Sequence, residues 1–290
     1  MLELIITCDD LGICKQRDLG IYKCITEGVA TAASIMANGE SAKTAVKLFS
    51  DNKKNIGLHL NLTEGYPISN PTQIQTLLNE KGMFLGKDGF RKALDENKIN
   101  INEVVYEITA QIKWFKTHFK QVPIYVDSHQ HVHVLPQLYK NIADILVTYS
   151  IKCVRIPGGH FHLLNTLCKA CSIVSQHATN ARIEYMKRGL VSPDIFVGLQ
   201  FCGSSYTAQQ LIDILKNIIE TPNIPNCVIE IMTHPGFRGN TWDTFNCAID
   251  RELEMNVLCS KELYDKINEM PIRLTSYSNS QLLLLQLLHV

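Results

Sequence analysis

The sequence has no excess of charge of either sign and no long hydrophobic run. Its 290 residues carry 28 basic and 28 acidic side chains, so the formal net charge at pH 7 is zero. A balanced chain lacks the basic face that binds nucleic acids or anionic membranes, and we expect neither as a partner. The longest apolar run, LLLLQLLHV at the C-terminus, is far shorter than the roughly 20 residues that a membrane helix needs.

The amino terminus and the cysteines bear on the compartment. The opening MLELIITCDD has no basic region before its apolar stretch, unlike a secretory signal peptide, so we expect a cytoplasmic protein. The 10 cysteines are scattered, several inside apolar runs, which is typical of buried free thiols in a reducing compartment. The CxxC pair Cys168 and Cys171 lacks a second pair or a histidine at zinc-finger spacing, and we assign it to the edge of an amphipathic helix.

Strand-like apolar runs alternate with helical stretches along the chain. LELIIT begins the pattern, and IGLHLNL, PIYVDSH, IKCVRI, DIFVGL, NCVIEIM and PIRLTSY continue it, with helical segments between them. Repeated strand–helix units predict a parallel sheet with crossover helices, that is, an α/β fold. About seven or eight such units in this length favour a single (β/α) TIM-barrel-like domain over residues 1–290 rather than an open sheet.

Two segments depart from this rhythm. Residues 66–100 are polar and broken by proline and glycine, and we interpret them as an insertion that forms a lid or rim. Residues 281–290 form an extra apolar tail. Because exposed apolar stretches often mark contacts, both segments are candidates for a homodimer interface, with packing across the barrel's own helices as the equal alternative.

Polar side chains gather where the predicted strands end, and in a barrel the carboxyl ends of the strands form the mouth that holds catalytic groups. The set comprises Asp9 and Asp10 from the first strand, His59, Asn61 and Thr63 from the third, Asp127, His129, His131 and His133 from the fourth, Arg155 from the fifth, and Glu230 and His234 from the seventh. Each motif alone also fits a turn, a core histidine or an ion pair. Their convergence at five strand ends indicates an active site.

Histidines and carboxylates without cysteine suit a divalent ion such as Zn²⁺, Mg²⁺, Mn²⁺ or Fe²⁺ in an open site. The stretch VDSHQHVHV, residues 126–134, places an aspartate and three histidines at alternate positions. In an extended strand Asp127 and His133 would lie about 20 Å apart, so all four cannot bind one ion. We expect the residue nearest the strand end to bind, and the others to orient ligands, contact substrate or pack the loop.

Five motifs in this order, CDDLG, GLHLNLTEG, VDSHQHVH, RIPGG and MTHPG, resemble the YdjC-like carbohydrate deacetylases, which include chitooligosaccharide deacetylases. The resemblance extends from the first strand to RLTSY near residue 277, although Leu11 stands where the family often has phenylalanine. It implies a TIM-barrel-like fold, a divalent ion and removal of N-acetyl groups from sugars. By motif, Asp10, His59 and His129 correspond to the metal ligands and Asp9 to the general base.

These residue types suit amide hydrolysis. One divalent ion, Mg²⁺ or Zn²⁺, bound by two histidines and a carboxylate would keep positions open for water and the carbonyl oxygen. Asp9 would take the water's proton, and His234 at a facing strand end is the candidate acid for the leaving amine. Arg155 would hold Asp9 ionised or contact a sugar hydroxyl, and Asp127 would orient a ligand imidazole.

Other functions share parts of this pattern. A metal phosphoesterase could use the same side chains, but it usually has more basic groups at the mouth and two or three ions. A metal-dependent sugar isomerase usually draws more ligands from Glu and Asp. A non-catalytic sugar- or metal-binding protein has no need for a free carboxylate such as Asp9. The small carbohydrate that we expect as substrate is not fixed by the motifs, and His131 and His133 are the alternatives to His234 as the acid.

Overall fold

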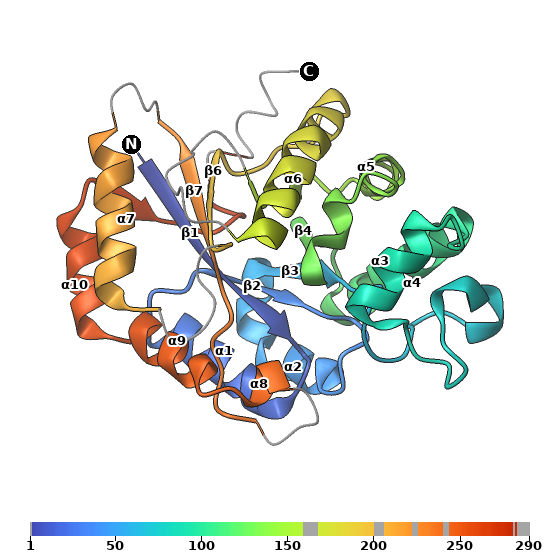
Figure 1. The fold of residues 1–290 in the computed structure, drawn as a ribbon. Coiled ribbons are helices and arrows are strands. Elements are labelled where there is room, and N and C mark those ends of the chain that lie inside the picture. The colour runs from blue at the N-terminus through green and yellow to red at the C-terminus, as the bar shows by residue number, and fades with distance from the viewer. Residues whose placement is uncertain are drawn as a thin grey trace.

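The computed structural model of the protein describes residues 2–158, 168–199, 206–221, 226–239, 244–280 and 282. Strands and helices alternate through these ranges (Figure 1). The strands are β1 (Leu2–Leu11), β2 (Ala32–Ile35), β3 (Ile56–Leu60), β4 (Tyr125–Ser128), β5 (Cys153–Val154), β6 (Ile195–Val197), β7 (Val228–Thr233) and β8 (Ile272–Leu274). The helices are α1 (Lys15–Thr26), α2 (Ala42–Leu48), α3 (Gly86–Asp95), α4 (Ile101–Phe119), α5 (Tyr139–Thr148), α6 (Lys169–Lys187), α7 (Ala208–Glu220), α8 (Thr244–Cys247), α9 (Asp250–Leu258) and α10 (Lys261–Glu269).

The strands form one parallel, curled sheet surrounded by helices (Figure 1). Their order is β5-β4-β3-β2-β1-β7-β6, and β8 pairs with the first residues of β1. Just before β6, the backbone of Val191 exchanges hydrogen bonds with Lys152 and Val154, so this segment lies beside β5 at the other end of the order. The expected α/β class and barrel-like arrangement of seven or eight strands are confirmed.

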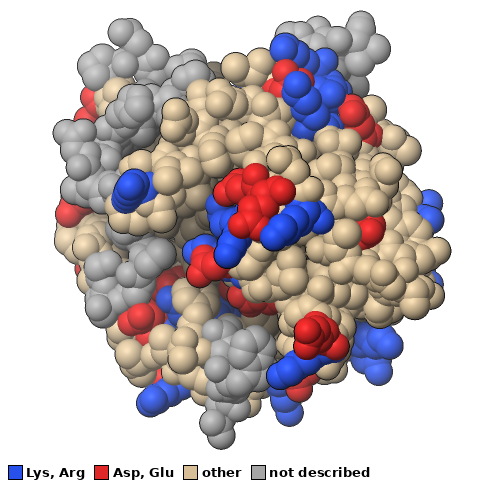
Figure 2. Space-filling model, turned by 45° about the vertical axis from the view of Figure 1, so that its right-hand side comes forward, with Lys and Arg blue, Asp and Glu red and all other residues tan. Residues whose placement is uncertain are grey.

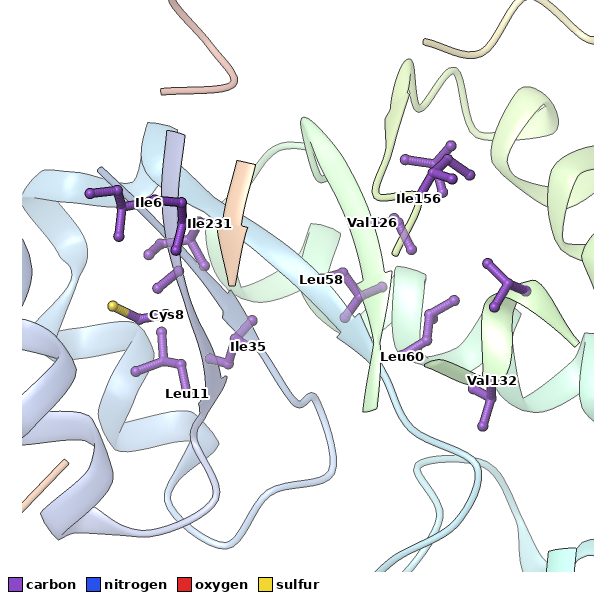
Figure 3. Close-up of a cluster of buried hydrophobic side chains, with 14 of the residues drawn as sticks. Ile6, Cys8, Leu11, Ile35, Leu58, Leu60, Val126, Val132, Ile156 and Ile231 are labelled. Atoms are coloured by element: carbon purple, nitrogen blue, oxygen red, sulfur yellow. The ribbon is translucent and has the colours of Figure 1, made fainter. Parts of the chain in front are cut away.

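The side chains of β1 alternate between two environments, because successive strand residues point to opposite faces. Leu4, Ile6 and Cys8 pack into the large core between sheet and helices, part of which Figure 3 shows. Ile5 belongs instead to a smaller buried cluster with Ala32, Tyr125, Cys153, Val228, Tyr277 and Leu282. The members from β1, β2, β4, β5 and β7, together with Tyr277 and Leu282 after β8, fill the interior of the barrel at its amino-terminal end.

Toward the carboxyl ends of the strands, the inward positions become polar. They are occupied by Thr7, Asp9, Ser34, His59, Asp127, Arg155 and Glu230, all of them buried. Burying polar groups is costly unless they pair with one another. The barrel interior therefore divides into an apolar layer and a polar layer above it, and the polar layer leads to the site described below.

Residues 66–100 connect β3 to α4 and contain α3. Their apolar side chains, among them Ile74, Leu77, Phe84, Phe90 and Leu94, are part of the main core. Other residues of this segment are exposed, and Lys87, Asp88 and Arg91 of α3 line a cavity. That the segment is an insertion stays a prediction.

The predicted tail 281–290 lies outside the described residues, apart from Leu282, which is buried inside the barrel. The tail-mediated dimer and the single domain over residues 1–290 thus stay predictions. No helix within the described ranges is long and apolar enough to cross a membrane. Figure 2 shows basic and acidic residues interspersed over one face, without a broad area of either charge among the residues coloured there.

We predict that Gly57→Ala destabilises the protein by about 1–3 kcal/mol, the usual cost of overpacking a core. A Cβ at Gly57 would lie 2.4 Å from Cζ of Tyr125. The Tyr125 ring cannot easily move away, because it stacks on Tyr277 with ring centroids 3.8 Å apart. Urea denaturation followed by circular dichroism measures the free energy of unfolding. Gly89→Ala in α3, where the new methyl meets only Leu85 Cβ at 3.3 Å, is the control; equal losses in both variants would contradict this packing.

Candidate active site

Asp9 and Asp10 are neighbours in the chain, yet both line the same cavity. A regular strand would point them to opposite faces. Asp10 instead has a left-handed backbone with φ of 65°, and the pairing of β1 with β2 shifts between Cys8 and Leu11. Gly12, just beyond, also has a positive φ, of 89°. The irregularity begins two residues earlier, at Asp10 itself, because aspartate tolerates the left-handed region better than most residues.

The strand ends open into a cavity of about 570 Å³. Its floor carries Asp9, Asp10, His59, His129, His131 and His234. One wall is charged and comes from α3, with Lys87, Asp88 and Arg91, while the facing wall is mainly apolar and includes Cys171, Ile173 and Val174 of α6. The sulfurs of Cys168 and Cys171 lie 3.1 Å apart. Cys168 is the residue before the first turn of α6, so the CxxC pair sits at the start of that helix. A cavity with a polar floor and an apolar wall is suited to a small organic ligand.

Asp10, His59 and His129 offer one ligand atom each within 4.8 Å of one another. Asp10 Oδ1 lies 3.4 Å from His59 Nε2 and 3.0 Å from His129 Nδ1. One carboxylate and two imidazoles at the edge of a cavity fit a divalent ion that keeps open positions. The far nitrogen of His59, Nδ1, lies 2.7 Å from Asp127 Oδ1, which is how metal-binding histidines are usually oriented.

A second group, Asp9, His59 and Asp127, meets the same distance criterion. It is less suited to an ion, because both of its carboxylates are already paired with the guanidinium of Arg155. Asp127 also lies behind the cavity rather than on its surface. The group around Asp10 is therefore the better candidate metal site.

The charges of the first group depend on one another. Burial opposes a charge on Asp10, but His129 and His59 outweigh it and hold the pKa of Asp10 well below 3.8. Burial likewise opposes a charge on His59, yet Asp127 is the main influence that raises its pKa, to about 10. For His129, Asp10 and Glu64 overcome burial and raise the pKa to about 9. A divalent ion that binds here must displace these protons, so binding is coupled to proton release.

Arg155 holds Asp9 from behind the cavity. Its Nη1 and Nη2 groups donate to Oδ2 and Oδ1 of Asp9 at 2.6 and 2.8 Å, respectively. Arg155 is fully buried and does not line the cavity, which favours a role in holding Asp9 over contact with a sugar hydroxyl. Burial nevertheless raises the pKa of Asp9 to about 6, against the opposing effect of Arg155. A carboxylate of this kind can exchange a proton near neutral pH, as a general base must.

His234 and His131 both line the cavity. His234 Nε2 lies 3.9 Å from Asp9 Oδ2, and the backbone N–H of His234 donates to Glu254 Oε2 at 2.5 Å. Burial holds the pKa of both histidines well below 6.5. Either ring is therefore neutral near neutral pH, and it must receive a proton before it can donate one to a leaving group.

The stretch VDSHQHVHV is not a continuous strand. β4 ends at Ser128, and a 3₁₀ segment, His129–Val134, follows. Gln130 and His131 within it have φ of 53° and 58°. The extended geometry expected for four alternating side chains is thus wrong, because the backbone reverses immediately after His129. This reversal keeps His129 and His131 at the cavity while the chain turns back into the protein.

His133 takes no part in the cavity surface. Its Nδ1 lies 2.5 Å from Ser128 Oγ and its Nε2 lies 2.8 Å from the backbone oxygen of Arg155. Burial lowers the pKa of His133 to about 4. Since both ring nitrogens have protein partners, His133 fixes the turn and the backbone of Arg155, and its geometry does not favour contact with substrate.

Asn61 also lies behind the cavity. Its Oδ1 accepts from the backbone N–H groups of Thr63 and Glu64 at 3.0 and 3.1 Å. Its Nδ2 donates to the backbone oxygen of Glu64 at 2.7 Å. Asn61 therefore shapes the loop after β3. Sequence reasoning did not single out two residues that the structure adds to the site: Ser34, with Oγ 3.1 Å from His59 Nδ1, and Glu64. In the register of β2 with β3 Ser34 pairs with Gly57, so it lies on the same face as His59 two residues further along β3, which strand alternation could have revealed.

Comparison with known proteins places this chain in a family. The family model for YdjC-like protein matches residues 3–269. A carbohydrate deacetylase from Xenopus laevis is 35% identical over 285 residues, covering 90% of this chain and 92% of the relative. A chitooligosaccharide deacetylase from Yersinia enterocolitica is 30% identical, with 95% and 98% covered.

A solved structure of a candidate cellobiose-phosphate cleavage protein from Enterococcus faecalis V583 superimposes with a TM-score of 0.75 at 24% identity. The match covers 95% of this chain and 97% of that chain. At this level of identity the likeness concerns the fold. The family model spans most of the chain and agrees with the motifs at the strand ends, so the chain belongs to the YdjC-like protein family.

Proposed function

We propose that the protein is a metal-dependent hydrolase that removes N-acetyl groups from acetylated sugars such as chitooligosaccharides. The observation that carries this proposal is that one cavity contains both a group of candidate metal ligands and a separate carboxylate that can accept a proton. Asp10, His59 and His129 offer one ligand atom each within 4.8 Å of one another, and Asp9, which lines the same cavity, is held by Arg155. The names of the relatives, carbohydrate and chitooligosaccharide deacetylases, support the same substrate class.

The ion, Mg²⁺ or Zn²⁺, would be bound by Asp10, His59 and His129 and would supply Lewis-acid polarisation of the amide carbonyl together with a more acidic water. Asp9 takes a proton from the attacking water. Asp9 can do so because Arg155 fixes both of its oxygens from one side while its carboxylate still faces the cavity.

His234 then protonates the leaving amine. Because burial keeps its ring neutral, the proton must arrive during the reaction, and protonated Asp9 can supply it, with Oδ2 3.9 Å from His234 Nε2. One proton thus passes from water through Asp9 and His234 to the nitrogen as the C–N bond breaks, while the water oxygen and its second proton leave with the acetyl group as acetic acid, which ionises to acetate in solution. The apolar wall from α6 would limit the access of bulk water during this transfer.

We further propose that the substrate is a small carbohydrate and that the protein works as one cytoplasmic domain. The single continuous sheet of the described residues supports one domain. The homodimer suggested by the apolar tail also stays a proposal, and light scattering on a chain truncated at residue 280 tests it.

The first test of this function measures metal and acetate together. Protein loaded separately with Mg²⁺ and Zn²⁺ should bind one ion per chain and release acetate from N,N′-diacetylchitobiose, but no phosphate from p-nitrophenyl phosphate. His59→Ala should lose both the ion and acetate release and keep its circular dichroism spectrum, because Asp127 retains its partner Arg155. Normal ion content in this variant would contradict the ligand set, and phosphate release without acetate would favour a phosphoesterase.

Asp9→Asn should keep the ion and the fold but lower kcat by roughly 10²–10⁴-fold, the usual contribution of a general base. The fold should persist because Arg155 still contacts Asp127 and Glu230. Ion content, thermal unfolding and steady-state kinetics check the three expectations. Turnover close to that of the wild type would show that another group accepts the water's proton.

His234→Ala is expected to lower kcat by roughly 10²-fold or more at unchanged ion content, as expected for loss of a general acid. His131→Ala, which removes a ring from the same cavity, is the matched comparison and should reduce kcat less. If the two effects are reversed, His131 is the acid. His133 does not enter the comparison, since both of its nitrogens have protein partners.

A further inference from the structure

Glu64, in the loop after β3, faces the candidate ligand His129 on the side away from Asp10. Its Oε2 lies 3.1 Å from His129 Nε2. The other ring nitrogen, Nδ1, lies 3.0 Å from Asp10 Oδ1. The imidazole is thus placed between two carboxylates, one for each nitrogen. Glu64 is the more accessible of the two, with 29% of its side chain exposed against 2% for Asp10.

The two sides of the ring are not equivalent. Nδ1 of His129 faces Asp10, whose Oδ1 is also 3.4 Å from His59 Nε2, so Nδ1 is directed at the candidate metal site. Glu64 does not belong to that group of convergent ligand atoms. From this geometry we propose that Glu64 is a positioning residue: it accepts the proton on His129 Nε2 and thereby directs the lone pair of Nδ1 toward the ion. This inference rests on the metal site of the proposed function.

His59 is oriented in the same way, but with the roles of its two ring nitrogens exchanged. Asp127 Oδ1 lies 2.7 Å from His59 Nδ1, which leaves Nε2 of His59 to face Asp10. The two histidines would therefore approach one ion through different nitrogens, each fixed by its own carboxylate. Such outer partners orient the ring and make it a better ligand, and their loss typically costs 10–100-fold in metal affinity.

Glu64 is itself held in place from several sides. Its backbone oxygen accepts from the side-chain amides of Asn61 and Asn38 at 2.7 and 2.9 Å. Its Oε1 accepts from Gln130 Nε2 at 2.6 Å. Gln130 has the left-handed backbone noted above, and its backbone carbonyl accepts from the guanidinium of Arg91 in α3 at 2.9 Å. The segment 66–100 thus reaches the ligand His129 through Gln130 and Glu64.

The test compares Glu64→Ala and Glu64→Gln, with Glu80→Gln as a matched control for the change of charge at an exposed glutamate. Zn²⁺ affinity is measured by competition with a chromophoric chelator. We expect Glu64→Ala to weaken Zn²⁺ binding 10–100-fold, and Glu64→Gln to weaken it less, because the amide oxygen still accepts from Nε2–H. The control should match the wild type. Equal affinities in all four proteins would contradict the role of Glu64.

A second readout identifies the ligand atom directly. In Zn²⁺-loaded protein labelled with ¹⁵N-histidine, long-range ¹H–¹⁵N spectra should show the proton of His129 on Nε2 and the ion on Nδ1. The reverse arrangement would overturn the proposal and make Glu64 a candidate ligand. An unchanged Zn²⁺ affinity with a raised KM in Glu64→Ala would overturn it as well and show that Glu64 contacts the sugar.

The readouts also separate this inference from the proposed function. At saturating Zn²⁺, Glu64→Ala should recover most of the wild-type kcat, since a positioning role acts through occupancy of the site. Wild-type protein that binds no Zn²⁺ would contradict the metal site and both proposals with it. Normal binding with no release of acetate would contradict the deacetylase activity alone and leave the role of Glu64 intact.

Discussion

The site depends on the ion pairs of one buried group, the guanidinium of Arg155. It contacts carboxylates from three strands: Asp9 of β1 at 2.6 Å, Asp127 of β4 at 2.9 Å and Glu230 of β7 at 2.9 Å. Three carboxylates could not lie together in the interior without such a partner, because an unpaired buried charge costs several kcal/mol. Through Asp127 the arginine also sets the ring of His59, so the proposed base and one proposed ligand share a single support.

Arg155 and its carboxylate partners form a layer between the apolar interior of the barrel and the cavity. Below it, Ile5, Tyr125 and Tyr277 fill the interior with apolar and aromatic groups, and above it the cavity opens. Water is thus kept from one side of the polar layer and admitted on the other. Burial raises the pKa of Asp9 while the facing guanidinium opposes the rise, and the result, about 6, allows proton exchange near neutral pH. The alternation of side chains along the strands therefore builds the apolar core and also buries Asp9, whose pKa this burial raises.

Much of this arrangement could be predicted from the sequence, because strand periodicity decides which side chains share a face. The positions of Asp9 and His59 at the ends of predicted strands were enough to group them, and apolar runs that alternate with helical stretches were enough to predict a parallel barrel-like sheet. The bend after His129 could not be predicted, since the left-handed backbone of Gln130 and His131 depends on contacts with distant segments such as Arg91. Glu64 was missed for the same reason: its partner lies 65 positions further along the chain.

The backbone itself indicates that the site is preformed. Asp10, Gln130 and His131 are three of the six non-glycine residues with positive φ in the described parts of the chain, and all three line the cavity. Such conformations cost about 1–3 kcal/mol each and persist only where the surroundings fix them. Here the fixing contacts are hydrogen bonds from His129 to Asp10 and from Gln130 to Glu64. The strain and the ligand geometry are therefore properties of one network, in which the candidate ligands are already directed toward a common point.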